Sequence, residues 1–213
     1  MRRPACLLMA LILMMLGVTP EARGQAPRAE PVDGLRIVAG AGLATLWDDE
    51  TFLGRGILLS GGVATPLGNH AAVEGELAWA SHHRDSGYLA ADGTPIVGMA
   101  RLAWRFRSAA SRVRPFASAG LGVVHSTGFL TTRTILVGAN GFPIEGPSIR
   151  TDWSLTQPVL ELGAGVSIAS GEQLWFRPAA RWTSTTESSS RGTLEPPLWL
   201  PRLELTVGWR PGR

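Results

Sequence analysis

Five side chains of the types used in hydrolytic or metal chemistry lie in two short segments of the sequence. The first segment holds His82, His83 and Asp85, and the second holds His125 and Ser126. A histidine, a hydroxyl and a carboxylate in mutual reach make an activated nucleophile, and imidazoles with a carboxylate bind zinc. Adjacent residues of a β-strand point to opposite faces, so His82 and His83 diverge, as do His125 and Ser126. We therefore predict no catalytic, metal or cofactor-binding residues, and no enzymatic activity.

A second set of ionisable residues lies in the middle of apolar segments. It contains nearly balanced numbers of glutamates and arginines, each sharing a face with small residues. Buried charge is tolerated only when it is paired and hydrogen-bonded, and the planar guanidinium of arginine suits that pairing. We interpret the set as a lattice of buried ion pairs, made of Glu74, Glu76, Glu161, Glu204, Arg101, Arg105, Arg177, Arg181 and Arg202.

The segments that carry these charges read as β-strands. Apolar residues alternate with small or charged residues, as where Leu102 and Trp104 oppose Arg101 and Arg105. Such a period of two gives a strand two chemically different faces. We predict eight antiparallel strands, at 35–47, 55–65, 71–83, 96–106, 115–126, 156–168, 174–185 and 200–209.

The face opposite the apolar one indicates which side of the sheet is inside. A solvated face would be rich in Lys, Thr and Gln, whereas this face is mostly small, which suits the crowded interior of a narrow barrel. We predict an all-β, eight-stranded, up-and-down transmembrane barrel with lipid outside. The competing interpretation is a soluble lipocalin-type barrel or sandwich with its apolar face inward. The small residues are Gly40, Gly42, Gly62, Ala64, Ala78, Ala80, Ala103, Gly163, Gly165 and Ala179.

The predicted connections alternate in length. Segments 66–70, 107–114 and 169–173 are short turns or compact links, and three of the four others, 48–54, 84–95, 127–155 and 186–199, are clearly longer. Outer-membrane barrels have short periplasmic turns and longer extracellular loops. With eight strands, both termini then lie on the periplasmic side.

Aromatic residues gather near the predicted strand ends, where membrane barrels carry interfacial belts. The chain has eight tryptophans and one tyrosine. We predict an outer belt of Trp47, Trp182 and Trp199, and a periplasmic belt of Trp104, Phe106, Phe116, Trp175, Phe176 and Trp209.

The first residues read as a secretory signal. Arg2 and Arg3 precede an apolar run at 7–18, which is shorter than the roughly 20 residues of a membrane-spanning helix. Cleavage before Gln25 makes residues 1–24 the signal peptide, 25–34 a flexible arm and 35–213 the outer-membrane barrel domain. The single cysteine, Cys6, leaves with the signal, so disulfides contribute nothing to the mature chain.

The charge composition argues against nucleic-acid binding. All 20 basic residues are arginine, which accounts for the high isoelectric point. Removing the signal takes away three arginines and one glutamate, which leaves 17 Arg against 16 Asp plus Glu, a net charge of +1. No basic run interleaved with aromatic residues is present, so we expect no nucleic-acid partner.

The segment Arg114-Pro-Phe-Ala-Ser-Ala-Gly-Leu-Gly-Val resembles a strand common in small outer-membrane barrels, the broad OmpA/OmpX/OmpW-like group. The stretches that begin at Gly61 and Leu160 are similar to its neighbouring strands. The terminal aromatic of that group is displaced here, because four residues follow Trp209. The resemblance implies an eight-stranded barrel in the cell outer membrane, in contact with lipid and lipopolysaccharide, with functions from envelope structure and adhesion to solute passage.

Two further expectations concern function. Some small barrels modify lipid A, and the deacylases among them use a His and a Ser two positions apart, a spacing that His125 and Ser126 lack. The long segment 127–155 has two apolar stretches around a Gly/Asn turn, which predicts a hairpin that extends the barrel wall. We expect a monomer without an open pore that contacts an extracellular partner through 127–155. A narrow channel for small or apolar solutes and a rim-sited lipid hydrolase remain alternatives.

Overall fold

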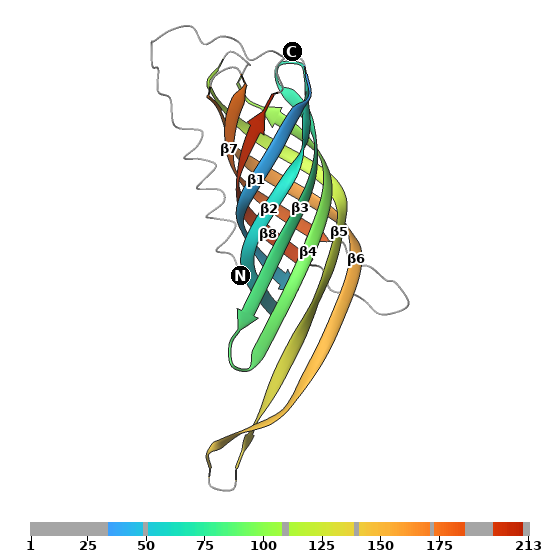
Figure 1. Ribbon diagram of the computed structural model, residues 1–213, viewed down its shortest axis with the longest axis vertical. Coiled ribbons are helices and arrows are strands. Elements are labelled where there is room, and N and C mark those ends of the chain that lie inside the picture. The colour runs from blue at the N-terminus through green and yellow to red at the C-terminus, as the bar shows by residue number, and fades with distance from the viewer. Residues whose placement is uncertain are drawn as a thin grey trace.

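Eight strands close into one barrel in the computed structural model, which describes residues 34–48, 51–107, 111–138, 141–170, 173–185 and 198–210 (Figure 1). Each strand pairs antiparallel with the next one in the chain, and β1 pairs with β8. The predicted eight-stranded up-and-down barrel is confirmed. The strands are β1 (Arg36–Asp48), β2 (Thr51–Leu67), β3 (Ala71–Asp85), β4 (Leu89–Arg105), β5 (Val113–Val137), β6 (Pro143–Ser170), β7 (Leu174–Thr185) and β8 (Leu198–Trp209).

The predicted signal peptide (1–24) and arm (25–34) lie outside the described residues, apart from Gly34. In the part of the chain that the structure describes, no helix is long and apolar enough to cross a membrane.

Several strands are longer than predicted. β7 has the predicted bounds, but β2, β4, β5 and β6 continue through segments predicted as the loops 48–54, 84–95 and 127–155. Between β3 and β4 only a tight turn remains, with Gly87 at a φ of 73°. In the outer part of β5 and β6 both faces of the hairpin are largely exposed, so the apolar alternation is lost there although the backbone pairing continues.

The longest strands form a hairpin that projects beyond the rest of the barrel, as the expected extension of the wall (Figure 1). The β4–β5 ladder stops at Leu89↔Thr132, whereas β5 and β6 stay paired as far as Val137↔Pro143. We call 133–148 the hairpin tip. The end of the barrel from which it projects is the hairpin end, and the opposite end, where β1 begins and β8 ends, is the turn end.

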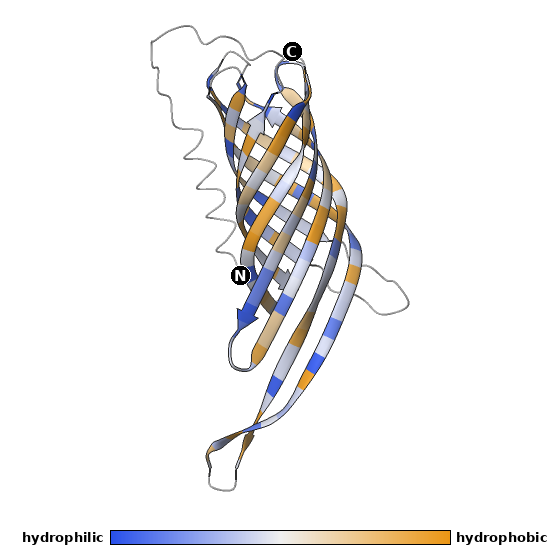
Figure 2. Cartoon of the chain, in the orientation of Figure 1, coloured by the Kyte–Doolittle hydropathy of each residue, from blue (hydrophilic) through white to orange (hydrophobic). Residues whose placement is uncertain are grey.

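The apolar face of the wall is outside. Large apolar side chains are exposed on every strand, including Leu43 (65%), Leu121 (66%) and Leu162 (67%). Figure 2 shows hydrophobic residues recurring along the strands between more polar ones. The charged and small residues face the lumen, where Arg101 and Glu161 are 3% and 2% exposed. The predicted orientation is confirmed, and the interpretation as a soluble barrel with an apolar interior is wrong.

Two members of the predicted periplasmic aromatic belt face the lumen instead. Phe116 and Trp175 are each 3% exposed, whereas Trp104, Phe106 and Trp209 are 45–57% exposed on the outer face. Side chains an even number of residues apart on a strand share a face. Phe116 and Trp175 are each an even number of residues from lumen-facing residues of their own strands, so they face the lumen too, and the prediction overlooked this.

Pro178 interrupts one ladder without shifting it. β6 pairs with β7 up to Gly165↔Ala179 and resumes at Ile168↔Phe176 in the same register. On its other side, Pro178 stays opposite Leu205 of β8. The local break in pairing that a strand proline requires is therefore confined to one seam.

The exposed apolar face generates a first prediction. Leu205 is 51% exposed and lies between Ala41 of β1 and Pro178 of β7 on the outer wall. Leu205→Arg should reduce the free energy of unfolding by roughly 2–4 kcal/mol, as arginine does on the lipid face of a barrel near the midplane. Urea unfolding in lipid vesicles measures the change. Thr134→Arg in the exposed hairpin tip is the control, with an expected effect within about 0.5 kcal/mol. Equal effects of the two substitutions would show that the apolar wall does not face lipid.

Candidate functional site

A layer of six buried ionisable residues crosses the middle of the lumen. We call it the charged girdle. Arg101 of β4 lies at its centre and binds Glu76 of β3 through two hydrogen bonds, of 2.8 and 2.6 Å. The same guanidinium donates to Glu161 of β6 through Nε and Nη2. The girdle consists of Glu76, Glu161, Glu204, Arg101, Arg181 and Arg202.

Glu161 joins the strands on the far side of the lumen. Besides Arg101, its carboxylate accepts hydrogen bonds from Arg181 Nη1 (3.3 Å), from Arg202 Nη2 and from Thr183 Oγ1 (3.0 Å). Both members of every one of these ion pairs have side chains that are at most 1% exposed. The predicted buried lattice is confirmed here, and one carboxylate connects β4, β6, β7 and β8.

Glu204 completes the girdle and shows why small residues are needed on the lumen face. Its Oε1 accepts hydrogen bonds from Ser60 (2.8 Å) and Thr206 (2.9 Å), and its Oε2 lies 3.3 Å from Arg181 Nε. A Cβ atom on Gly40 would lie 2.5 Å from Ser60 Oγ and 2.6 Å from Glu204 Oε1. Glycine at position 40 therefore leaves the space that the carboxylate occupies.

Between the girdle and the hairpin end, most of the buried side chains that fill the lumen are apolar. Leu58 is 0% exposed, Val97 1% and Leu46 2%, and they pack in a single cluster. A cluster packed in this way excludes water. We call it the apolar plug, and it consists of Ala44, Leu46, Leu53, Leu58, Ala78, Ala80, Val97, Met99, Val124, Val159, Leu198 and Leu200.

At the turn end, the lumen carries a second group of charges. Glu74 and Arg177 both belong to the predicted lattice, and Arg177 Nη1 donates to Glu74 Oε1. Arg105 is buried beside them, as predicted. Sequence reasoning missed Arg36 and Arg114, which are 3% and 0% exposed. The strand period of two could have predicted them, because Arg36 is on the same strand face as Gly40, and Arg114 is on the same face as Ser118.

The residues considered for catalysis do not assemble. His125 is exposed and its Nδ1 lies 2.8 Å from Thr156 Oγ1, while Ser126 is buried and accepts a hydrogen bond from Trp153 Nε1 at 3.4 Å. The adjacent His and Ser thus face opposite sides of the wall, as the strand period predicts, so His125 cannot serve as base for Ser126.

The histidines on β3 diverge as well. His82 points into the lumen and is 1% exposed. His83 is on the outer face, where its Nδ1 lies 2.8 Å from Asp92 Oδ1. Among the described residues, no three His, Cys, Asp or Glu side chains are grouped as metal ligands would be.

The hairpin tip is the most exposed apolar surface outside the barrel wall. Val137 is 78% exposed, Phe142 69% and Ile144 53%. Below the tip, Arg150 stacks on Phe129, with its Cζ 3.9 Å from the ring centroid, and pairs with Asp152 at 3.0 Å. The Arg150–Asp152 pair is exposed on the hairpin, with side-chain exposures of 58% and 69%.

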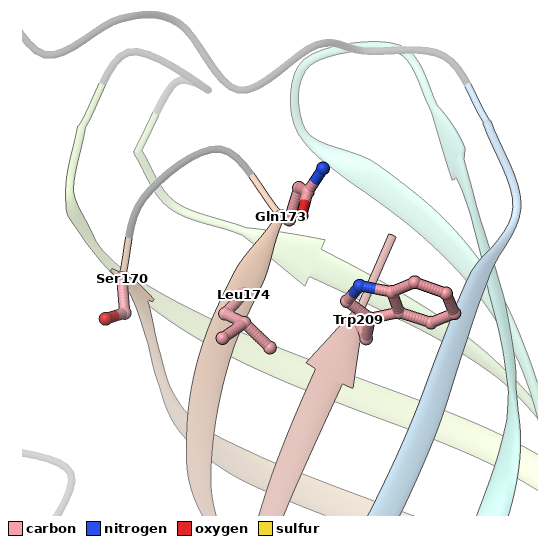
Figure 3. A pocket seen from close by; sticks show the side chains of 4 residues that line it. All are labelled: Ser170, Gln173, Leu174 and Trp209. Atoms are coloured by element: carbon pink, nitrogen blue, oxygen red, sulfur yellow. The ribbon is translucent and has the colours of Figure 1, made fainter. Parts of the chain in front are cut away.

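A shallow hollow of about 340 Å³ lies at the turn end (Figure 3). It is lined by Ser170, Gln173, Leu174 and Trp209, and Figure 3 shows the side chains of Leu174 and Trp209 close together below Gln173. Leu174 and Trp209 are 41% and 45% exposed on the outer wall. No ionisable group lines the hollow, so it offers no chemistry.

Comparisons with known proteins show the fold. No protein-family model and no curated protein matches the sequence. Neisserial surface protein A has a similar structure, with a TM-score of 0.58 and 13% identity, over 83% of this chain and 96% of that chain. Ail, the attachment invasion locus protein of Yersinia pestis, matches with a TM-score of 0.51 and 16% identity, over 84% and 99% of the two chains. Both are small outer-membrane barrels, so the fold is that of this class.

The girdle generates a second prediction. Arg101→Ala leaves Glu76 and Glu161 buried without their central cation, and loss of one partner of a buried pair costs roughly 3–5 kcal/mol. Arg150→Ala removes a pair whose side chains are 58% and 69% exposed, and such pairs contribute about 0–1 kcal/mol. Urea unfolding of both variants in the same vesicles gives the comparison. Similar losses would mean that water reaches the girdle.

Proposed function

We propose that this protein is a resident of the cell outer membrane in which a closed barrel anchors an extracellular binding hairpin. The observation that carries the proposal is the contrast between the filled lumen of the barrel and the exposed hairpin. The lumen is filled by the charged girdle and the apolar plug, whereas β5 and β6 continue past their neighbours and expose apolar side chains at the tip.

The outward apolar wall supports the location. Leucine, valine and tryptophan side chains cover the outside of the barrel. Contact with water would make this apolar surface unfavourable, whereas contact with lipid stabilises it. Neisserial surface protein A and Ail share the fold at low identity. With the short turns on the periplasmic side, the hairpin end faces outward, through the lipopolysaccharide layer.

The hairpin tip supports a binding role. Exposed apolar groups on a soluble surface mark sites of contact with other molecules. The tip lies about ten residues beyond the level of His125 along β5, and a strand rises about 3.3 Å per residue. If His125 lies at the level of the lipid headgroups, this reach supports a position of Val137 and Ile144 outside the bilayer, where a macromolecular partner can contact them.

A closed lumen makes a third prediction. Purified protein in planar bilayers should give no large, stable openings, because the girdle and the plug occupy the cross-section. Single-channel recording at both polarities tests this. Reproducible nanosiemens openings from intact protein would favour the alternative of a solute channel over that of a closed anchor.

The tip makes a fourth prediction. A variant with Val137→Ser, Phe142→Ser and Ile144→Ser should keep the heat-modifiable gel mobility of a folded barrel, because surface changes of this kind alter stability little. A photoreactive amino acid in place of Thr134 should form adducts on intact cells with the wild-type tip, and these should be lost in the triple variant.

The control for this experiment places the same photoreactive group at Arg112, which is exposed at the turn end. Adducts that carry protein support a protein partner, and adducts that carry lipopolysaccharide assign the tip to the envelope. Undiminished adducts in the triple variant would contradict a binding role for the apolar tip.

A further inference from the structure

Apolar side chains at the end of the projecting hairpin cover both of its faces. Ile135 and Val137 lie on one face, because residues two apart on a strand share a face. Leu136 lies on the opposite face, where it is 51% exposed and pairs with the exposed Ile144 of β6. The ring of Phe142 is exposed beside the turn. We call residues 135–138 and 141–144 the apolar apex.

The apex extends beyond the other described strands of the barrel. The β4–β5 ladder ends at Leu89↔Thr132, and β6 pairs with β7 only between Val159↔Thr185 and the turn end. Figure 1 shows the hairpin continuing away from the barrel past the turn between β3 and β4. Among the described strands, only β5 and β6 therefore lie beside the apex, and no barrel wall is available to cover its apolar side chains.

Charged residues are absent from the apex and flank it in equal numbers. The sequence from 134 to 144 contains no Asp, Glu, His, Lys or Arg. The nearest ionisable residues along the hairpin are two of each sign, Arg133, Arg150, Glu145 and Asp152. A partner recognised by charge would meet a surplus of one sign. Apolar contact is therefore the interaction that the apex offers.

The backbone of the apex limits how deeply it can enter an apolar medium. β5 and β6 stay paired up to Val137↔Pro143, and the turn adds hydrogen bonds of 2.9 Å from Gly138 N to Phe142 O and from Gly141 N to Gly138 O. The two outer edges of a two-stranded hairpin still carry backbone groups without strand partners, which the hydrocarbon core of a bilayer does not tolerate. The boundary between headgroups and acyl chains, where water still reaches these edges, is compatible with them.

The dimensions of the apex fit that boundary. From Ile135 to the turn, a rise of about 3.3 Å per residue gives a reach of roughly 10 Å. Elements that bind in the membrane interface bury their apolar side chains about 5–10 Å deep. A protein that packs on one face of the hairpin requires apolar side chains on that face alone, whereas a medium that surrounds the apex requires them on both.

We propose that the apolar apex inserts into the surface of a phospholipid bilayer that faces the cell, distinct from the membrane that holds the barrel. The inference rests on the proposed function, because the hairpin meets such a bilayer only if it projects outward. Insertion is shallow and apolar, so phosphatidylcholine, which has no net charge, is sufficient. Arg133 and Glu145 set its limit, because charged side chains remain among the headgroups.

The test uses the full mature chain in lipid nanodiscs, mixed with separate phosphatidylcholine vesicles. The only cysteine of the sequence, Cys6, lies in the predicted signal peptide, so an introduced cysteine can be labelled alone. An environment-sensitive fluorophore on Val137→Cys should shift to the blue and be quenched by brominated lipid in the vesicles. The same label on Ser148→Cys is the matched control, since Ser148 lies opposite Arg133 below the apex, and it should show neither change.

Flotation of the nanodiscs with the vesicles separates insertion into lipid from docking on a protein. Val137→Ser, Phe142→Ser and Ile144→Ser together should reduce the floating fraction about tenfold or more, because three apolar side chains no longer leave water. Val137→Leu, Phe142→Leu and Ile144→Leu together should preserve flotation, since lipid requires apolar character, whereas a protein surface requires a complementary shape. Neither phosphatidylglycerol in the vesicles nor raised salt should change the result.

The proposal is overturned if the label at position 137 responds no more than the label at position 148, or if the leucine variant floats as poorly as the serine variant. It is also overturned if flotation requires anionic lipid. In those cases, protein-bearing adducts from the photoreactive group at Thr134 would still support a binding hairpin with a protein partner. Failure of vesicle binding, together with adducts that the serine variant leaves undiminished, would contradict the proposed function as well.

Discussion

The structure depends on the pairing of arginine with glutamate inside a barrel too narrow to admit much water. Eight strands enclose a space that side chains can fill, so any charge that points inward must find its partner across the lumen. Glu161 shows the consequence, because Arg101, Arg181 and Arg202 converge on it from three other strands. The network joins strands that are not neighbours in the wall and fills the middle of the lumen.

Because structural side chains fill the lumen, we expect functional surfaces at the ends of the molecule. Among the described residues, the apolar plug and the charged girdle occupy the lumen one above the other. What remains accessible is the projecting hairpin and the turn end. At mid-height, the large exposed side chains of the described outer wall are apolar, which suits an anchor in lipid.

The period of two in the sequence was sufficient to predict the strands, their faces and the ion-pair lattice. It failed where the period carries less information. Both faces of the projecting part of β5 and β6 are exposed, so this part of the sequence has no alternation and is predicted as a loop. Near the strand ends, the alternation of faces was not applied to every residue. Trp175 and Phe116 were therefore assigned to an aromatic belt, and the lumen-facing Arg36 and Arg114 were missed.

The partners within the girdle could not be predicted at all. Arg101 and Glu161 are 60 residues apart and lie on strands β4 and β6, which are separated in the wall by β5. Which side chains meet across the lumen depends on the tilt and stagger of the closed barrel, and no single strand contains that information. The buried Glu74 and Arg177, 103 residues apart, illustrate the same limit.

The distribution of charge along the lumen follows from the cost of desolvation. The girdle lies between the apolar plug and the turn end, and its three arginines and three glutamates are neutral together. Each of its carboxylates has a guanidinium partner, so ion pairs within the same layer offset the cost of removing these charges from water.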